Sequence, residues 1–111
     1  MRKLIFVSVA AAALSAPAWA QSASSAGQSA MQDNKAAMEK MMKNMDAVQD
    51  MDPDVAFAKK MRAHHQGAVD MSDVELKYGN DAEAKAEARN VKEENEKSIK
   101  KLDAWLTKHA K

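Results

Sequence analysis

Two adjacent histidines, His64 and His65, lie in a stretch of the chain that also contains two methionines. At 100° per residue, one stripe of a helix is formed there by Phe57, Met61, His64, Ala68 and Met71. Imidazole nitrogen and thioether sulfur are both ligands for soft and borderline transition metals, copper above all. We therefore expect this stripe to be the buried face of a helix and to bind a metal ion.

More methionines gather in residues 29–49, which contain no Leu, Ile, Phe, Gly or Pro. A helical wheel places five of them, with Val48, within about 120° of one another. These five are Met31, Met38, Met41, Met42 and Met45. Packing alone explains a single Met, but five without one Leu favour a metal-binding or dynamic Met-lined surface. The candidate metal ligands are therefore His64, His65, Met38, Met41, Met42, Met45, Met61 and Met71.

The two neighbouring histidines are expected to have different roles. Adjacent helical residues point about 100° apart, so His64 and His65 cannot readily bind the same ion in an undistorted helix. We expect His64 to point inward, where it either binds metal or forms a hydrogen bond with Asn95 in the core. His65 is expected at the edge of the groove, one turn from Met61. The third histidine, His109, is expected to be solvated near a helix end.

Three helices are predicted to position these side chains. The first covers residues 29–49. Asp52 and Pro53 are typical of a helix start and predict a second helix over residues 53–78. A glycine-asparagine pair ends it, and the third helix is expected over residues 82–108. Short connections make neighbours antiparallel, so the predicted fold is all-α, a small up-down-up helical bundle.

Folding the first two helices back on each other sets the predicted level of their side chains. Met42 then lies level with Met61, and Met38 lies level with His64 and His65. One side of the long second hairpin stays uncovered in this arrangement. A second copy of the chain could pack there as a homodimer.

Residues 1–20 have the pattern of an export signal, with a basic start, an apolar stretch over 4–14 and an Ala-Trp-Ala cleavage site ending at Ala20. The mature chain is expected to begin with a flexible tether over residues 21–28, which are rich in Ser and Ala. The apolar stretch is too short to span a bilayer, so we expect no stable membrane anchor. The predicted location is the periplasm.

Composition excludes several function classes. Removal of the signal takes two of the 17 basic side chains and none of the 16 acidic ones, so the net charge becomes −1. Nucleic acid and anionic membranes are therefore not expected as partners. The chain has no Cys, so soft-metal binding depends on Met and His. No nucleophile-base or catalytic carboxylate pair is visible, so residues 29–111 are expected to be a helical metal-binding domain and not an enzyme.

The order aromatic, Met, His-His, Ala, Met also resembles a family pattern. It is matched by Phe57, Met61, His64-His65, Ala68 and Met71, and a looser second pattern by Ala88, Val91, Ile99, Leu102 and Trp105. On these residues the chain is similar to the small exported proteins of domain-of-unknown-function family 305. Those proteins are ferritin-like helical bundles and include CopM-type periplasmic copper-binding proteins. The resemblance implies copper binding and copper tolerance, carried by Met61, His64, His65 and Met71.

Two functions are compatible with these patterns. The first is a periplasmic copper buffer or carrier that takes Cu(I), accepts Cu(II), and delivers copper to an exporter or another periplasmic copper protein. The alternative is a Met-rich helical chaperone or adaptor that binds apolar segments without metal. Only the first function requires the imidazoles of His64 and His65.

Overall fold

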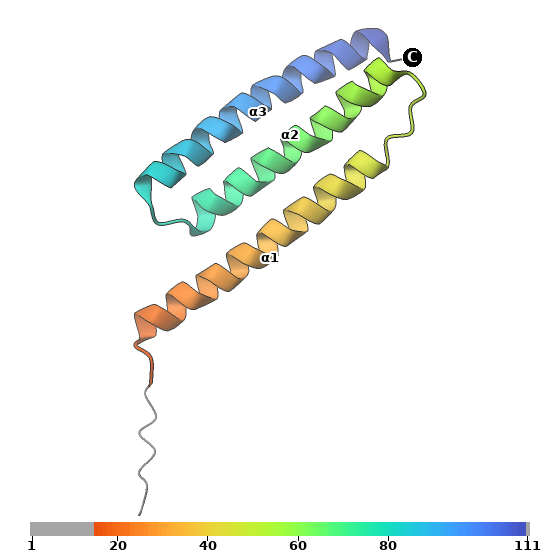
Figure 1. The fold of residues 1–111 in the computed structure, drawn as a ribbon. Coiled ribbons are helices and arrows are strands. Elements are labelled where there is room, and N and C mark those ends of the chain that lie inside the picture. Colours follow the sequence, from red (N-terminus) through yellow and green to blue (C-terminus); the bar gives the residue numbers. More distant parts are fainter. Residues whose placement is uncertain (1–14, 111) are drawn as a thin grey trace, which may run out of the picture.

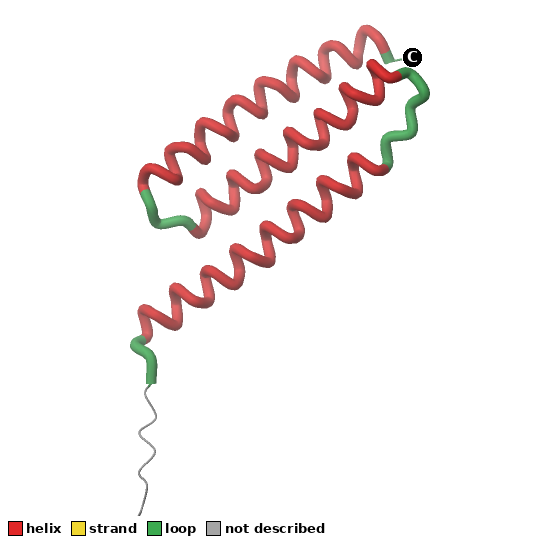
Figure 2. The backbone as a smooth tube through the Cα atoms, in the orientation of Figure 1, coloured by secondary structure: helices red, strands yellow, loops and turns green. Residues whose placement is uncertain are grey.

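The computed structural model describes residues 15–110 (Figure 1). Residues 1–14, which hold most of the predicted export signal, lie outside the described residues. The helices are α1 (Ala18–Asp46), α2 (Pro53–Tyr78) and α3 (Ala82–His109). Figure 2 shows them joined by loops, with neighbouring helices antiparallel, which confirms the all-α, up-down-up prediction. None of these helices, in the described part of the chain, is long and apolar enough to cross a membrane.

Local signals fix the ends of α2 where the sequence predicted them. The Asp52 carboxylate caps the start, accepting a hydrogen bond of 2.9 Å from the backbone N–H of Asp54. At the other end the N–H of Gly79 donates to the carbonyl of Glu75 at 2.7 Å. A Cβ atom at this glycine would lie 2.6 Å from the same carbonyl oxygen, so the close approach requires glycine. Asp81 caps α3 in the same way as Asp52 caps α2.

The structure differs from the prediction at α1, which begins at Ala18 instead of residue 29. Residues 21–28, expected as a flexible tether, are therefore helical. This segment has no Pro and no β-branched residue, and Ala has the highest helix propensity. The expectation rested on the absence of large apolar side chains, which predicts poor packing and not a lack of helix. α1 also ends sooner, at Asp46, and leaves a longer connection over residues 47–52.

The three helices lie in a row with α2 in the middle (Figure 1). Within residues 15–110, α1 and α3 make no contact with each other, and each packs on one side of α2. The Cα trace is only 13 Å across its thinnest direction. The bundle is therefore a single layer with two broad open faces and has no central core shared by all three helices.

Small side chains fill the helix contacts. The buried residues are Ala37, Val55, Ala58, Val69, Ser72, Val74 and Ala88, together with Gly67. No large side chain in the described part of the chain is fully buried. Small residues allow two helices to approach closely, and at Gly67 a Cβ atom would overlap the sulfur of Met41. The large apolar side chains are consequently left for the open faces.

One open face carries ion pairs that connect α2 to its neighbours. These are Lys40–Asp70 (3.3 Å), Lys59–Asp50 (3.0 Å), Lys77–Asp33 (3.7 Å), Lys92–Asp73 (2.6 Å) and Arg62–Asp103. The α2 members of these pairs fall within about 80° of one another on the helical wheel. We call this surface the charged face.

Hydrogen bonding raises the pKa of two lysines on the charged face. The pKa of Lys92 lies above its ordinary value because its ammonium donates to Asp73 and is attracted by that carboxylate. The pKa of Lys77 is raised first by its side-chain interaction with Tyr78 and then by the charge of Asp33. Lys92 thus joins α3 to α2, and Lys77 joins α2 to α1, through contacts that favour the charged ammonium.

The opposite open face carries most of the methionines of the helices. On α2 its centre lies about 180° from the charged face, along the stripe that contains Phe57, Met61 and His64. On α1 the wheel separates Asp33 and Lys40, on one side of Ala37, from the methionines on the other side. We call this surface the Met face. It consists of Met31, Met38, Met42 and Met45 on α1, Phe57, Met61, His64, Ala68 and Met71 on α2, and Ser98, Leu102 and Trp105 on α3.

Candidate metal site

His65 is the histidine that α2 directs toward α3. Its Nδ1 lies 2.6 Å from Oδ1 of Asn95, and both residues are half-buried. The amide nitrogen of Asn95 donates to the carbonyl of Val91 at 2.8 Å, so its oxygen must be the atom that faces the imidazole. An amide oxygen only accepts, so Nδ1 of His65 carries the proton and donates. In the neutral ring Nε2 then keeps its lone pair, which is the arrangement found in metal-binding histidines.

Met61 lies beside this imidazole, one helical turn before it. The two side chains share a hollow of about 220 Å³ that is lined by residues of both α2 and α3. Its walls are Phe57, Met61, His65, Ser98, Lys101 and Leu102. Residues four apart on a helix are neighbours, with Cβ atoms about 5–6 Å apart. A soft thioether and an imidazole ring thus line one small groove.

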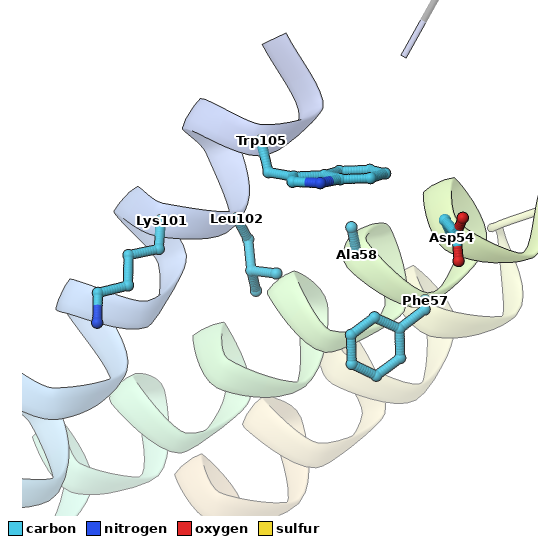
Figure 3. Close-up of a pocket in the computed structure, with 6 residues that line it drawn as sticks. All are labelled: Asp54, Phe57, Ala58, Lys101, Leu102 and Trp105. Atoms are coloured by element: carbon cyan, nitrogen blue, oxygen red, sulfur yellow. The ribbon is translucent and has the colours of Figure 1, made fainter. Parts of the chain in front are cut away.

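A larger hollow of about 500 Å³ continues this groove toward the start of α2 and the end of α3 (Figure 3). Phe57, Lys101 and Leu102 line both hollows. Figure 3 shows the Trp105 indole extending from α3 toward α2, whereas the Lys101 side chain points away from it. The ring of Trp105 also stacks on His109, with ring centroids 4.2 Å apart. His109 is exposed, as expected, and its Nδ1 lies 2.8 Å from the carbonyl oxygen of Trp105.

The expected roles of the two adjacent histidines are exchanged in the structure. His64 is exposed on the Met face, and His65 has the bond to Asn95 that was expected for His64. The reason is that Ala58, His65 and Val69 form the side of α2 that packs on α3, and His64 points about 100° away from it. The two rings remain near each other, with centroids 6.0 Å apart and planes at 78°.

The predicted buried stripe of α2 is also wrong, because it is the open side of that helix. Phe57 is 63% exposed, His64 is exposed, and Met61, Ala68 and Met71 are half-buried. The stripe was identified by its large side chains, but the contacts between helices select small ones. Met71 therefore lies on the same face as His64, two turns further along α2.

The predicted level of α1 against α2 is wrong by about two helical turns. Met41 packs against Gly67, and Lys40 pairs with Asp70, so α1 is displaced along α2. The reason is that the 47–52 connection runs back beside the first turns of α2, where Asp50 binds Lys59. Met42 therefore does not reach the level of Met61, and Met38 does not reach His64 or His65.

This register gives the α1 methionines different surroundings. Met41 and Met45 are half-buried beside α2, and Met45 lies at about the level of His64. Met38 and Met42 are 51% and 52% exposed, in a shallow hollow formed by α1 alone. Its walls are Met31, Asn34, Lys35, Met38, Glu39 and Met42.

The eight candidate ligands thus divide between two places. His65 and Met61 share the groove between α2 and α3, whereas His64, Met71 and most of the α1 methionines lie on the Met face nearer α1. Among residues 15–110, no group of three or more His, Cys, Asp or Glu side chains is arranged to hold a metal ion. The sequence reasoning did not identify Lys101 as a wall of the groove, since it does not stand out in the periodic pattern of α3.

Comparison with protein families gives one match. Residues 12–106 match the family described as a domain of unknown function, DUF305. The chain belongs to this family. Among curated proteins, no relative matches it. The match covers all of α1 and α2 and nearly all of α3, and so includes both groups of candidate ligands.

Proposed function

We propose that this chain binds copper in the periplasm, Cu(I) in preference to Cu(II), and buffers or carries it so as to contribute to copper tolerance. The observation that carries the proposal is the orientation of His65, whose Nδ1 donates to Asn95 and whose Nε2 is left available beside Met61. Imidazole and thioether are both suited to Cu(I), and thioether binding releases no proton. The proposed role is binding and transfer, not catalysis.

The charge around the groove favours the monovalent ion. Lys101 lines the groove, and a nearby ammonium repels a divalent cation about twice as strongly as a monovalent one. The neutral ligands Met61 and His65 do not offset that repulsion. The absence of Cys from the chain also disfavours a structural zinc site with thiolate ligands.

The Met face suits the transfer of copper to another protein. Met38 and Met42 are about half exposed, and His64 is exposed between them and the groove. Weak neutral ligands at a surface allow an ion to pass to a partner by ligand exchange. We propose a copper exporter or another periplasmic copper protein as that partner, with Met38, Met42, Met45, Met71 and His64 as an outer, weaker set of ligands.

The test is competition for Cu(I) against a soluble chelator under reducing conditions. His65→Gln and Met61→Leu are each expected to lower the affinity at least about tenfold, which is ~1.4 kcal/mol. His109→Gln is the matched control, because it removes an exposed imidazole outside the groove, and it should leave the affinity unchanged. His64→Gln should have a smaller effect than His65→Gln. Unchanged affinity in His65→Gln, or tighter binding of Zn(II) than of Cu(I), would overturn the proposal.

One observation favours the alternative, a chaperone or adaptor for apolar segments. The hollow of about 500 Å³ between Phe57 and Trp105 is lined mainly by apolar side chains and is open to solvent. An apolar peptide bound there would make Trp105 fluorescence respond to the peptide without copper. Phe57→Ala would weaken that response and His65→Gln would not, which is the reverse of the order expected for copper binding.

A further inference from the structure

The Met face leaves several large apolar side chains of the described part of the chain exposed. Met31 is 73% exposed, Phe57 is 63% exposed, and Met38 and Met42 are each about half exposed. The buried residues of the described part are, in contrast, small ones such as Ala37, Val69 and Ala88. A single layer of three helices therefore buries mostly small side chains, and several of its largest apolar side chains stay exposed to water.

A short chain with so small a core usually gains stability from a disulfide, a metal or a partner. Disulfides are excluded because the chain has no Cys. We infer that the Met face is covered by the Met face of a second copy of this chain, so that two layers of three helices form a homodimer. This inference does not depend on copper binding, and the copper transfer proposed above, which uses an exposed Met face, then takes place from the monomer.

The size of the Met face fits this occupant. The 26 residues of α2 make that helix about 39 Å long, and three helices spaced 8–10 Å apart are about 28 Å wide. The face therefore covers about 1,100 Å², compared with about 800 Å² per partner in a standard stable interface. A pair would bury large Met and Phe side chains in a continuous core between the layers.

The charges at the rim favour a second copy over a lipid surface. The charged side chains that line the hollows of this face are Lys35, Glu39, Asp54 and Lys101, two of each sign. Lys35 and Glu39 already form an ion pair at 3.8 Å. An anionic membrane attracts a rim rich in Lys and Arg, which this face does not have. A neutral rim of mixed sign is compatible with its own copy, as a self-complementary interface requires.

The geometry of the row places α2 at the centre of the dimer. A two-fold axis through the middle of the interface, either along or across the helices, sets α2 opposite α2 because it is the middle helix. The exposed imidazole of His64 then faces the partner copy and is removed from bulk water.

The test measures the mass of the exported protein in solution by light scattering after gel filtration, with a chelator present to remove copper. Met38→Glu with Met42→Glu places two carboxylates in the interface and should reduce the mass from two chains to one. The matched control is Gln32→Glu with Ala36→Glu, which adds the same charges at the same spacing on another side of α1, at exposed positions. The control should remain dimeric. Circular dichroism checks that both variants keep their helices, as expected for exposed positions.

Three results would overturn the inference. The first is a wild-type protein with the mass of one chain at every concentration. The second is a dimer that survives the two Met→Glu substitutions, which would place the interface elsewhere. The third is a monomer that sediments with vesicles of phosphatidylglycerol and phosphatidylcholine, which would make a lipid surface the occupant of the Met face.

Discussion

The charged face and the Met face belong to the same three helices, yet they hold the helices in different ways. On the charged face, side chains of α2 form ion pairs with both neighbours, so its polar groups have partners within the chain. On the Met face, thioether, imidazole and aromatic groups have few partners within the chain. The difference indicates that the groups of the charged face are paired within the chain, whereas many groups of the Met face are left available to a ligand or partner.

The contrast also explains why the helix contacts are made of small residues. Ala58, Val69 and Ala88 allow α2 and α3 to approach, and Gly67 does the same for α1. Close helices keep both faces flat and leave room for large side chains only on the open sides. The position of the candidate metal ligands is thus a consequence of how the row packs.

Gly67→Leu is the substitution expected to disturb this arrangement most. Even a Cβ atom at this position overlaps Met41, so a larger side chain must push α1 away from α2. Overpacking of this kind costs about 1–3 kcal/mol in the free energy of unfolding, which urea denaturation measures. Adding Met41→Ala should restore part of the loss. A Gly67→Leu protein as stable as the wild type would show that α1 does not pack closely on α2.

Asn95→Leu should have the next largest effect, and it acts at the groove between α2 and α3. It removes the acceptor of the Nδ1 proton of His65, which leaves a half-buried donor without its partner at a cost of about 1 kcal/mol. Loss of a group that orients a metal-binding histidine lowers metal affinity by about 10- to 100-fold. Copper competition and thermal unfolding measure the two effects.

Asn90→Leu is the control for Asn95→Leu, because Asn90 is exposed on the same helix. It should change neither copper affinity nor stability appreciably. Equal copper affinity in Asn95→Leu and Asn90→Leu would mean that the orientation of His65 is irrelevant to binding.

Much of the fold follows from local signals that a sequence displays directly. Asp52, Pro53 and Gly79 fix the ends of α2, and Asp81 fixes the start of α3. The short connection of residues 79–81 also determines how α3 lies against α2, so Asn95 was expected near the histidine pair and is found there. The start of α1 has no capping side chain, and the sequence pattern placed it at residue 29 instead of Ala18.

Local signals do not predict the position of α1 along α2, nor which of His64 and His65 faces α3. The six residues that follow Asp46 extend back along α2, and helix periodicity does not contain the path of a loop. A wheel also shows which residues share a side of a helix but not which side faces a neighbour. We took the side with the largest apolar residues as the buried one, and a single layer of helices reverses that choice.

Lys92→Met tests the charged face and should have a smaller effect than either substitution above. It keeps most of the aliphatic chain and removes the ion pair with Asp73. Exposed ion pairs contribute little and are weakened by salt, so we expect a slightly lower melting temperature and a smaller difference in high salt. Copper affinity should not change. A decrease in copper affinity would show that the two faces are coupled.

The pH dependence of the difference in melting temperature between wild type and Lys92→Met follows from the direction of the pKa shift of Lys92. The pKa of Lys92 is raised in the folded state, so the folded protein holds this proton more tightly than the unfolded chain. The stabilisation by the Lys92–Asp73 pair is fully present below the ordinary pKa of lysine and is lost as pH rises through the higher pKa of the folded state. Melting temperatures of wild type and Lys92→Met should therefore converge in strongly alkaline solution.

The smallest effect is expected for Glu93→Gln, in a pair that belongs to α3 alone. Lys97 lies one turn from Glu93 and donates to it at 2.6 Å, and this hydrogen bond lowers the pKa of the carboxyl. A lowered pKa means that the folded state binds the proton more weakly than the unfolded chain. The stabilisation is therefore present above the ordinary value near 4.5 and is lost as pH falls through the lower folded value. Wild type should melt slightly above Glu93→Gln at neutral pH, and the two should coincide in strong acid. Because other carboxyl groups titrate equally in both proteins, the difference between the two melting temperatures isolates this pair. A difference that persists in strong acid would assign the effect to helix propensity instead of the ion pair.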